Sequence, residues 1–465
     1  MQNNFLYGKK VLVIGCGESG LAMANWCILK QAQVYIADSR ENPPMRHNLN
    51  ININFHYGIN QDTVANINPE LILVSPGLSP HFSFLKDIYI YSQENNILIQ
   101  SELWLFNQAL SELRKSLKYE PKILAITGTN GKTTTTNLTA HLCKEAGFTT
   151  AVAGNISPSL LQALYQYIEH DNLPQIWILE LSSFQLHNID NFNSNASAIL
   201  NITNDHLDWH LNLEEYIKDK FNIIGKDSQV ILNRQDKYLN AYIDNTTISF
   251  GIDLPENNSN NWGLNLQPDG FWIYYKSKNL IPINSLKIRG LHNAQNVMTA
   301  LALCAAIKID IQDILASLRT YQGESHRVEL ITIINDIEIY DDSKGTNVGA
   351  TIAAIEGLGK QIVLIAGGDG KGQNFSDLSN CFKKYIQSVH LIGKDKQEIA
   401  KICIESNISY FLYDTLEEAT INAYKLTKPH QALLLSPACA SLDMFKNYTH
   451  RANIFKQTIT NLIEN

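Results

Sequence analysis

A glycine-rich loop with hydroxyls and one lysine follows the apolar segment KILAIT. Its residues are Gly128, Thr129, Asn130, Gly131, Lys132, Thr133 and Thr134. A strand that leads into such a loop and then into a helix presents backbone N–H groups and the positive helix end to phosphate oxygens. Lys132 would neutralise the β- and γ-phosphates of ATP, and the Thr133 hydroxyl would join a Mg²⁺ shell. The run is shorter than GxxxxGK[ST], but a plain turn would not need this lysine and these hydroxyls.

Polar residues also end two later apolar segments. Glu180 closes IWILE, and Asp205 and His206 follow ASAILNIT. Oxygen and imidazole ligands at neighbouring strand ends suit Mg²⁺ ions that bridge ATP to an acceptor. His206, Asp208 and His210 also permit a zinc hypothesis, although zinc would need further ligands that are not evident nearby. For Glu180, the simpler alternative is a carboxylate that caps a helix.

A second glycine-rich loop, GCGESG at 15–20, follows KKVLVI, and Asp38 ends the next apolar segment. This pattern is typical of a dinucleotide site in which the acid binds a ribose hydroxyl. It is equally consistent with a pocket for a nucleotide-diphosphate sugar. Glu18 is unfavourable in both cases, because a carboxylate repels a pyrophosphate unless it points away.

Three more loops follow apolar segments near the end of the chain. They are DDSKGTN at 341–347, GGDGKG at 367–372 and SPACAS at 436–441. We expect them to share one edge of a sheet, where open α/β sheets bind ligands. Their lysines and hydroxyls suit an anionic amino acid and ATP phosphates. Cys439 at a helix start could be a nucleophile with a lowered pKa, but no His or Asn partner is indicated, so we favour a structural thiol.

The composition narrows the class of protein. A length of 465 residues allows for three domains at ~150 residues each, and 45% hydrophobic and 18% charged residues are normal for a folded, soluble chain. A net charge of -8 argues against a general nucleic-acid binder. We expect no cleavable signal and no membrane insertion. The seven cysteines (16, 27, 143, 304, 381, 403 and 439) lack a CxxC pair and indicate reduced thiols in the cytoplasm.

Alternating strand and helix patterns predict the elements that position these loops. We expect an α/β protein of three domains: a Rossmann-like parallel sheet at 1–111, a P-loop ATPase-like domain at 112–323 and a second Rossmann-like domain at 324–465. Segments 111–121 and 321–327 are predicted linkers and hinges. Residues 228–290, with short alternating strands, predict a small β-rich elaboration within the central domain.

The motifs resemble those of the Mur ligases, in order, from the first glycine loop to about Arg451. They are GTNGKT, LELSSFQL, NITNDHLD, HNAQN, SHR, DDSKGTN, GGDGKG and SPACASLDMF. DDSKGTN and SPACASLDMFKNY are similar to segments of the members that add D-glutamate, and the DNPR motif of the diaminopimelate-adding relative is absent. The resemblance implies an ATP-dependent amide ligase of cell-wall precursor synthesis. Its substrates would be UDP-N-acetylmuramoyl-L-alanine and D-glutamate, and an acyl phosphate would be its intermediate.

The resemblance also implies a role for individual residues. The uridine substrate would be bound by Ser19, Asp38, Ser39, Arg40, the turn Ser75-Pro76-Gly77 and, near the acceptor, Asn155. The ATP loop would be completed by Asn293, Asn296, Arg327, Asp342 and Lys344. D-Glutamate would be held by Lys344, Thr346, Ser441, Leu442 and Tyr448, the last standing where the family often has Phe. Glu18 replaces a residue that is usually uncharged.

By the same resemblance, Mg²⁺ would be held by Thr133, Glu180 and His206. Lys220 matches a lysine that the family carries as a carbamate, and an ordinary surface lysine is the alternative. Catalysis would depend on Lys132, Glu180, His206, Lys220 and Lys344. We expect a monomer that binds neither nucleic acid nor membrane. The alternatives are another Mur or folylpolyglutamate-type ligase, a P-loop kinase and a non-catalytic nucleotide sensor.

Overall fold

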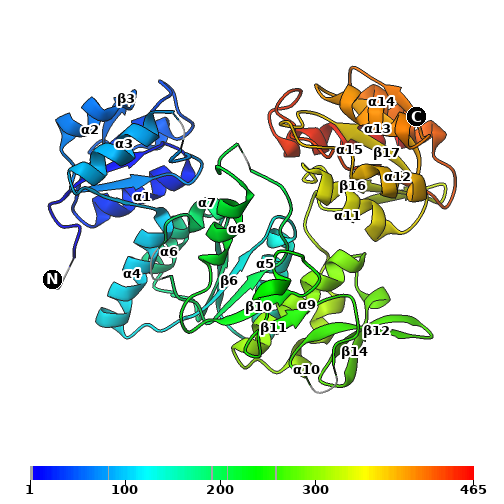
Figure 1. The fold of residues 1–465 in the computed structure, drawn as a ribbon, viewed down its shortest axis with the longest axis horizontal. Coiled ribbons are helices and arrows are strands. Elements are labelled where there is room, and N and C mark those ends of the chain that lie inside the picture. Colours follow the sequence, from blue (N-terminus) through cyan, green and yellow to red (C-terminus); the bar gives the residue numbers. More distant parts are fainter. Residues whose placement is uncertain (1–3, 82, 190–191, 207, 257–258, 465) are drawn as a thin grey trace.

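The computed structural model describes residues 4–81, 83–189, 192–206, 208–256 and 259–464. Leu207, in the NITNDHLD motif, therefore lies outside the described residues. Figure 1 shows three lobes that follow one another along the chain, from blue through green to red. Within the described ranges each lobe contains one sheet, of five, nine and six strands in turn. The predicted three-domain α/β architecture is confirmed.

The first lobe is an open, fully parallel sheet with the strand order β3-β2-β1-β4-β5. Its inner strands are apolar along their length because helices cover both faces. The strand order reverses between β1 and β4, which is where open α/β sheets bind ligands. The elements are β1 (Lys10–Ile14), α1 (Glu18–Leu29), β2 (Gln33–Asp38), β3 (Asn54–Tyr57), α2 (Gln61–Ile67), β4 (Leu71–Val74), α3 (Ser83–Glu94) and β5 (Leu98–Gln100).

The second lobe has the strand order β14-β13-β12-β11-β10-β9-β6-β8-β7. The β-rich region at 228–290 is confirmed, but its strands extend the main sheet: β10 pairs in parallel with β9, and β12 to β14 are antiparallel. The elements are β6 (Lys122–Thr127), α5 (Lys132–Glu145), β7 (Thr150–Gly154), α6 (Leu160–Glu169), β8 (Ile176–Glu180), α7 (Ser183–Leu186), β9 (Ala196–Ile199), α8 (Leu213–Phe221), β10 (Gln229–Asn233), β11 (Ile248–Phe250), β12 (Trp262–Gln267), β13 (Gly270–Tyr275), β14 (Lys278–Pro282), α9 (Leu291–Ala306) and α10 (Ile311–Ile314).

The third lobe has the strand order β15-β16-β20-β17-β18-β19, with only β15 antiparallel among these strands of the described chain. β16, β20 and β17 are neighbours, so the three loops that follow them meet at one edge, as expected. The elements are β15 (Glu329–Ile334), β16 (Ile337–Asp341), α11 (Val348–Leu358), β17 (Ile362–Gly367), α12 (Leu378–Tyr385), β18 (Ile386–Ile392), α13 (Lys396–Glu405), β19 (Ser409–Leu412), α14 (Leu416–Leu426), β20 (Ala432–Leu435) and α15 (Tyr448–Glu464).

The predicted linker at 111–121 is wrong over most of its length. Helix α4 (Glu102–Leu117) continues through residues 111–117, and its first turn is capped by the Ser101 side chain, which accepts a hydrogen bond from the Trp104 N–H. Its apolar residues recur at helical spacing and face inward, so the polar outer face in SELRKSL does not interrupt the helix. The second predicted connection, 321–327, contains neither helix nor strand.

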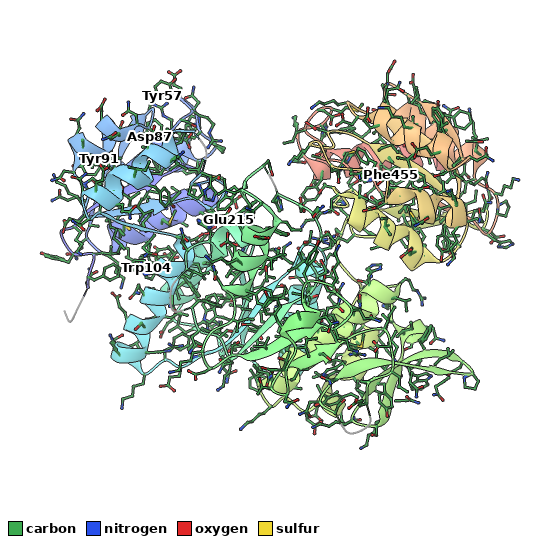
Figure 2. All side chains as sticks on the ribbon, viewed as in Figure 1. Tyr57, Asp87, Tyr91, Trp104, Glu215 and Phe455 are labelled. Atoms are coloured by element: carbon green, nitrogen blue, oxygen red, sulfur yellow. The ribbon has the colours of Figure 1, made fainter. Side chains whose placement is uncertain are left out.

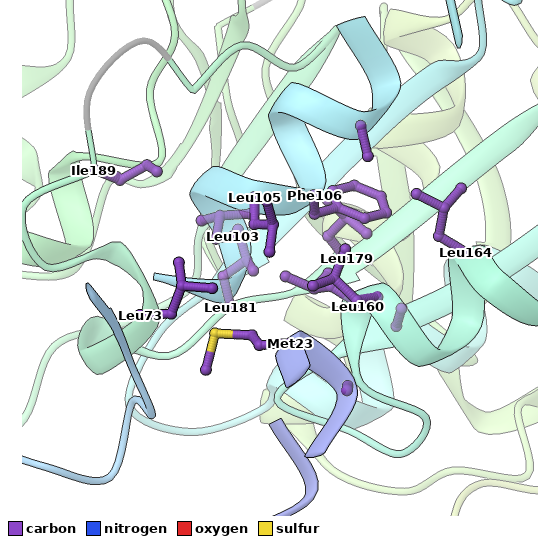
Figure 3. Close-up of a cluster of buried hydrophobic side chains, with 14 of the residues drawn as sticks. Met23, Leu73, Leu103, Leu105, Phe106, Leu160, Leu164, Leu179, Leu181 and Ile189 are labelled. Atoms are coloured by element: carbon purple, nitrogen blue, oxygen red, sulfur yellow. The ribbon is translucent and has the colours of Figure 1, made fainter. Parts of the chain in front are cut away.

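The first and second lobes share one hydrophobic cluster, and each also has a cluster of its own. Met23 and Leu73 of the first lobe belong to the same buried cluster as Phe106 of α4, Leu160 of α6 and Leu179 of β8 (Figure 3). The third lobe has clusters of its own. Among the described residues, no helix has the length and apolar character that a bilayer crossing requires.

Candidate functional site

The loop between β6 and α5 is folded into a tight cradle. Gly131 has φ +85°, and a Cβ there would lie 2.6 Å from Asn296 Oδ1, so this position requires glycine. Lys132 Nζ donates to the carbonyl oxygens of Gly128 at 2.8 Å and Thr129 at 2.9 Å. Burial lowers the pKa of Lys132, and the nearby Glu180 carboxylate opposes that shift. The lysine predicted to bind phosphate therefore lies against the loop that it would serve.

Lys220 of α8 reaches the same loop from the other side. Its side chain is only 2% exposed, and Nζ donates to Gly128 O at 3.1 Å. Nζ also lies 4.4 Å from the centroid of the Tyr216 ring. Burial lowers the pKa of Lys220 well below its ordinary value, and the Lys132 charge adds to this effect. The surface-lysine alternative is wrong.

Glu180 ends β8 beside this cradle, and its carboxylate is buried. Oε1 accepts a hydrogen bond from Asn155 Nδ2 at 3.1 Å. Oε2 is buried and has no hydrogen-bond partner in the part of the chain that the structure describes. An anionic oxygen left without a donor is costly. A cation held there would satisfy it, so this position fits the predicted Mg²⁺ better than a helix cap.

His206 follows β9 with a positive φ of 56°. Its Nε2 lies 3.6 Å from Asp205 Oδ2, and its side chain is 42% exposed. Partial burial lowers the pKa of His206, and the charges of Lys132 and Lys220 lower it further. His206 is thus within electrostatic reach of both lysines, and the neutral imidazole is the form that binds metals.

The zinc hypothesis is wrong for His210. This ring is fully buried. Its Nε2 lies 2.9 Å from Ser183 Oγ and its Nδ1 lies 3.3 Å from Asp219 Oδ2. The buried ring therefore has a protein neighbour at each nitrogen, although Nδ1 makes no hydrogen bond within the described residues. The oxygen and imidazole donors that remain, on Thr133, Glu180 and His206, suit Mg²⁺.

A cavity of about 400 Å³ lies at the switch point of the first sheet. Its lining includes seven of the eight residues predicted to bind the uridine substrate: Ser19, Asp38, Ser39, Arg40, Ser75, Pro76 and Gly77. The eighth, Asn155, does not line this cavity and bonds to Glu180 instead. Glu18, the residue that argued against a pyrophosphate, is an exposed first-turn residue of α1 at the cavity wall.

Asp38 is fully engaged in this lobe. Its carboxylate accepts from Cys16 N at 2.7 Å, Arg40 N at 2.9 Å, and Arg40 Nε and Nη2 at 2.8 Å each. These bonds hold the first glycine loop against the end of β2. The dinucleotide interpretation, in which this acid binds a ribose hydroxyl directly, is not supported by this geometry.

The remaining predicted ATP residues lie around the phosphate loop. On α9, Asn296 Oδ1 accepts from Thr135 Oγ1 at 3.2 Å, and Asn296 Nδ2 donates to Asn293 Oδ1 at 3.0 Å. From the third lobe, Arg327 Nη2 donates to Thr133 Oγ1 at 2.9 Å. Asn296, held by Asn293, therefore lies next to Gly131 of the loop, while Arg327 reaches the loop from the third lobe.

Asp342 lies inside the third lobe. It is 5% exposed and accepts from Ser436 Oγ at 2.7 Å. Burial raises the pKa of Asp342 to about 7. The carboxylate therefore joins the loops after β16 and β20.

The five residues predicted for D-glutamate come from those same loops and from the start of α15. Lys344 Nζ lies 5.4 Å from the centroid of the Tyr448 ring, and Ser441 is buried while Thr346 and Leu442 are exposed. Cys439 is buried, and burial raises its pKa to about 12, which favours the structural thiol over the nucleophile. All seven cysteines are free thiols, as predicted.

Two features of this lobe were missed in the sequence. Arg451 is fully buried and donates to Ser343 O at 2.8 Å and to Cys439 O at 3.2 Å, which clamps two loops together. His326, Glu329 and Asp341 form a cluster with metal-like spacing. Lys456 Nζ, at 3.0 Å from Glu329, occupies the position of a cation. For Arg451, the sequence offered one indication: a basic residue in DMFKNYTHR, shortly after the SPACAS loop.

Comparison with known proteins agrees with this geometry. Three family models match: the Mur ligase MurD-like N-terminal domain at 9–91, the Mur ligase middle domain at 126–304 and the Mur ligase glutamate ligase domain at 326–439. The chain belongs to the Mur ligase family. Relatives of this Mur ligase include the UDP-N-acetylmuramoylalanine--D-glutamate ligases of Paraburkholderia xenovorans and Burkholderia ambifaria. Each is 43% identical; the alignments cover 97% of this chain and 95% and 96% of those proteins.

Solved structures share the fold of this Mur ligase at low sequence identity. The UDP-N-acetylmuramate-alanine ligase MurC of Thermotoga maritima gives a TM-score of 0.60 at 17% identity, over 97% of this chain and 99% of that one. The MurF ligase of the same organism, solved in complex with ADP, gives a TM-score of 0.59 at 15% identity, over 99% of this chain and 97% of that one. The three-lobe arrangement is therefore common to family members with different names.

Proposed function

We propose that this Mur ligase joins D-glutamate to UDP-N-acetylmuramoyl-L-alanine in the cytoplasm, with ATP converted to ADP and phosphate. The observation that carries this proposal is full-length similarity, at 43% identity, to relatives that are named for this reaction. The site geometry supports it: a phosphate loop, a separate nucleotide-sized cavity and a third loop cluster are each present. The last two hold most of the residues expected to bind the two substrates.

The proposed reaction has two steps. The L-alanine carboxylate attacks the γ-phosphorus of ATP, which forms an acyl phosphate and releases ADP. The D-glutamate amine then attacks the acyl carbon, the C–O bond to phosphate breaks, and the amine proton is lost. A carboxylate is a poor acyl donor, so ATP supplies the leaving group, and the protein contributes alignment and charge neutralisation.

Residues near the phosphate loop divide this work. Lys132, which now bonds to Gly128 O and Thr129 O, would exchange those carbonyls for phosphate oxygens. Asn155, whose side chain donates to Glu180, would contact the acceptor substrate. Thr133, Glu180 and His206 would hold Mg²⁺, which when bound stabilises the negative charge that builds on the phosphates.

Lys220 is the residue we propose to be carbamylated. CO₂ reacts with a neutral amine, and burial favours the neutral form of this lysine. Carbamylation would turn this buried amine into an anionic oxygen donor beside Gly128. That change would add a negative ligand to the three Mg²⁺ donors. It would do so where Lys132 and Lys220 both donate to Gly128 O.

The third lobe would bring D-glutamate to the acyl phosphate by closing on the second lobe. Arg327 already reaches Thr133, and Asn347 Nδ2 donates to Asn130 Oδ1 at 3.2 Å. These contacts place the DDSKGTN loop against the phosphate loop. Residues 321–327 would serve as the hinge, with Lys344, Thr346, Ser441, Leu442 and Tyr448 around the amino acid.

The decisive experiment offers amino acids one at a time, with ATP, Mg²⁺ and UDP-N-acetylmuramoyl-L-alanine, and detects products by mass spectrometry. We expect a new amide only with D-glutamate, together with ADP and phosphate. Lys132→Ala should lower turnover by roughly 10²–10³-fold, whereas Lys144→Ala, an exposed lysine on the same helix, should not. An amide with another amino acid would indicate a different ligase. A stable phosphorylated product would indicate a kinase, and nucleotide binding without turnover a sensor.

A further inference from the structure

The turn that follows β4 links the first cavity to the second lobe. Pro76 and Gly77 line the cavity, and two hydrogen bonds leave the turn for one residue of the second lobe. Trp209 Nε1 donates to Pro76 O at 3.1 Å, and Ser79 Oγ donates to Trp209 O at 2.7 Å. Trp209 is 6% exposed. Its indole and its own carbonyl are thus both fixed by the loop that borders the cavity.

Trp209 also belongs to the turn that carries His206. Trp209 N donates to His206 O at 3.0 Å. The Phe184 ring connects the two side chains: it stacks on Trp209 with centroids 4.8 Å apart and 27° between the planes, and it meets the His206 ring edge-on at 4.8 Å. His206 therefore has a backbone connection and a ring connection to Trp209.

The interface around Trp209 is held by polar contacts as well as by packing. His81 of the first lobe lies 2.7 Å from Glu215 Oε1 of α8, and Figure 2 shows Glu215 on the side of the middle lobe that faces the first lobe. The His187 ring packs edge-on against Trp209 at 5.2 Å. Because two hydrogen bonds join the turn to Trp209, a shift of the Pro76–Ser79 turn would displace Trp209 or break those bonds.

We propose that Trp209 is a positioning residue that ties the cavity of the first lobe to His206. A uridine nucleotide that orders the Pro76–Ser79 turn would, through Trp209 and Phe184, fix the imidazole beside the phosphate loop. The role rests on the proposed function, because it takes the cavity as the uridine site and His206 as a ligand near ATP. It explains how a substrate bound in one lobe prepares the reaction centre of the next.

The test observes His206 directly, without metal or ATP. The full-length protein is labelled with ¹³C at histidine Cε1, the His206 signal is assigned from His206→Gln, and UDP alone is titrated. UDP lacks the muramoyl peptide that could contact His206 directly. A change in the His206 signal therefore reports a link through the protein. We expect the His206 signal of the wild type to move as UDP binds, and that movement to be lost in Trp209→Phe. This substitution keeps an aromatic ring against Phe184 but removes the indole N–H.

Two further variants separate the link from general damage. Ser79 lies outside the core, and Ser79→Ala removes the hydrogen bond from Ser79 Oγ to Trp209 O. This variant should show a smaller movement of the His206 signal. Trp272 lies on β13, and its indole N–H donates to Asp269 Oδ1 at 2.8 Å. Trp272→Phe removes that bond and should leave the movement of the His206 signal unchanged. In assays, kcat of Trp209→Phe should fall about three- to tenfold, as expected for a lost buried hydrogen bond, with a smaller change in KM for the uridine substrate.

Each outcome decides the proposal. A His206 signal that stays still while UDP binds to the wild type overturns the link but leaves the proposed function standing. Full movement in both Trp209→Phe and Ser79→Ala also overturns it. If UDP does not bind to the wild type by calorimetry, the assignment of the cavity fails, and the link fails with it.

Discussion

Replacement of Asp38 by asparagine should destabilise the first lobe and weaken UDP binding together. The buried carboxylate accepts one bond from Cys16 N and three from Arg40. A hydrogen bond to a charged group contributes about 1.5–3 kcal/mol, but the Arg40 side chain is 55% exposed, so its ion pair contributes no more than about 1 kcal/mol. Asparagine keeps one acceptor and turns an amide N–H toward Arg40. We therefore expect a loss of about 1–3 kcal/mol in the free energy of unfolding.

Because the same bonds fix residues 15–17 at the cavity, the UDP affinity of Asp38→Asn should fall about three- to tenfold, which corresponds to one weakened hydrogen bond. Urea unfolding and isothermal calorimetry measure the two effects. Asp87→Asn, an exposed substitution on α3 (Figure 2), is the control and should change neither. An Asp38→Asn protein of wild-type stability that loses UDP binding would refute the reasoning, because it would mean that the carboxylate contacts the nucleotide directly.

The contribution of Asp38 to stability should depend on pH in a definite direction. The pKa of Asp38 is lowered in the folded protein: burial alone would raise it, but the hydrogen bonds from Arg40 and Cys16 outweigh that effect. Its contribution to stability is therefore complete above the unfolded value of about 3.9 and is lost as the pH falls through the folded value. The stability difference between wild type and Asp38→Asn should be full at pH 7 and should narrow below about pH 4.

Three more predictions concern the second and third lobes. Burial raises the pKa of Asp342 to about 7, so the folded protein retains a proton that the unfolded chain loses, and wild-type stability should fall as the pH rises from about 4 to about 7. Thermal unfolding of Asp342→Asn should lack that decline. The same pH dependence of stability in both proteins would contradict the prediction. Removal of CO₂ from all buffers should lower turnover, and bicarbonate should restore it if Lys220 is carbamylated; Lys218→Ala should respond as the wild type does. Arg327 contacts Thr133 of the phosphate loop, so Arg327→Ala should remove a charge-assisted contact to ATP and bind an ATP analogue about tenfold more weakly. Unchanged affinity in fluorescence titration would count against that role.

Short-range patterns predicted much of this protein. Gly131 is required by a positive φ and by the closeness of Asn296, and that requirement is visible in the sequence as a glycine before lysine and hydroxyls. The glycine loop at 15–20 and the loops after β16, β17 and β20 were likewise located by apolar strands that end in polar residues. Strand order then brought them together, because the carboxyl ends of parallel strands lie at the same edge.

Long-range contacts account for what the sequence did not disclose. The hydrogen bond from Cys16 N to Asp38 depends on how β1 and β2 pair, and a lone acid after a strand looks the same whether it binds a ligand or a loop. Arg451 lies far along the chain from Ser343, whose carbonyl it satisfies. Residues 111–117 look like a linker because only the inner face of α4 is apolar, and the partners of that face come from both lobes.

The shared core beneath α4 has a consequence for how the chain folds. Met23 and Leu73 are buried against side chains that come later in the sequence, beyond residue 101. A nascent first lobe would thus expose that apolar face until the second lobe had been synthesised, and the two should unfold in a single cooperative transition. The third lobe has its own buried clusters and can melt separately. Calorimetry should therefore resolve two transitions rather than three, and the units of cooperativity would not coincide with the units of substrate binding.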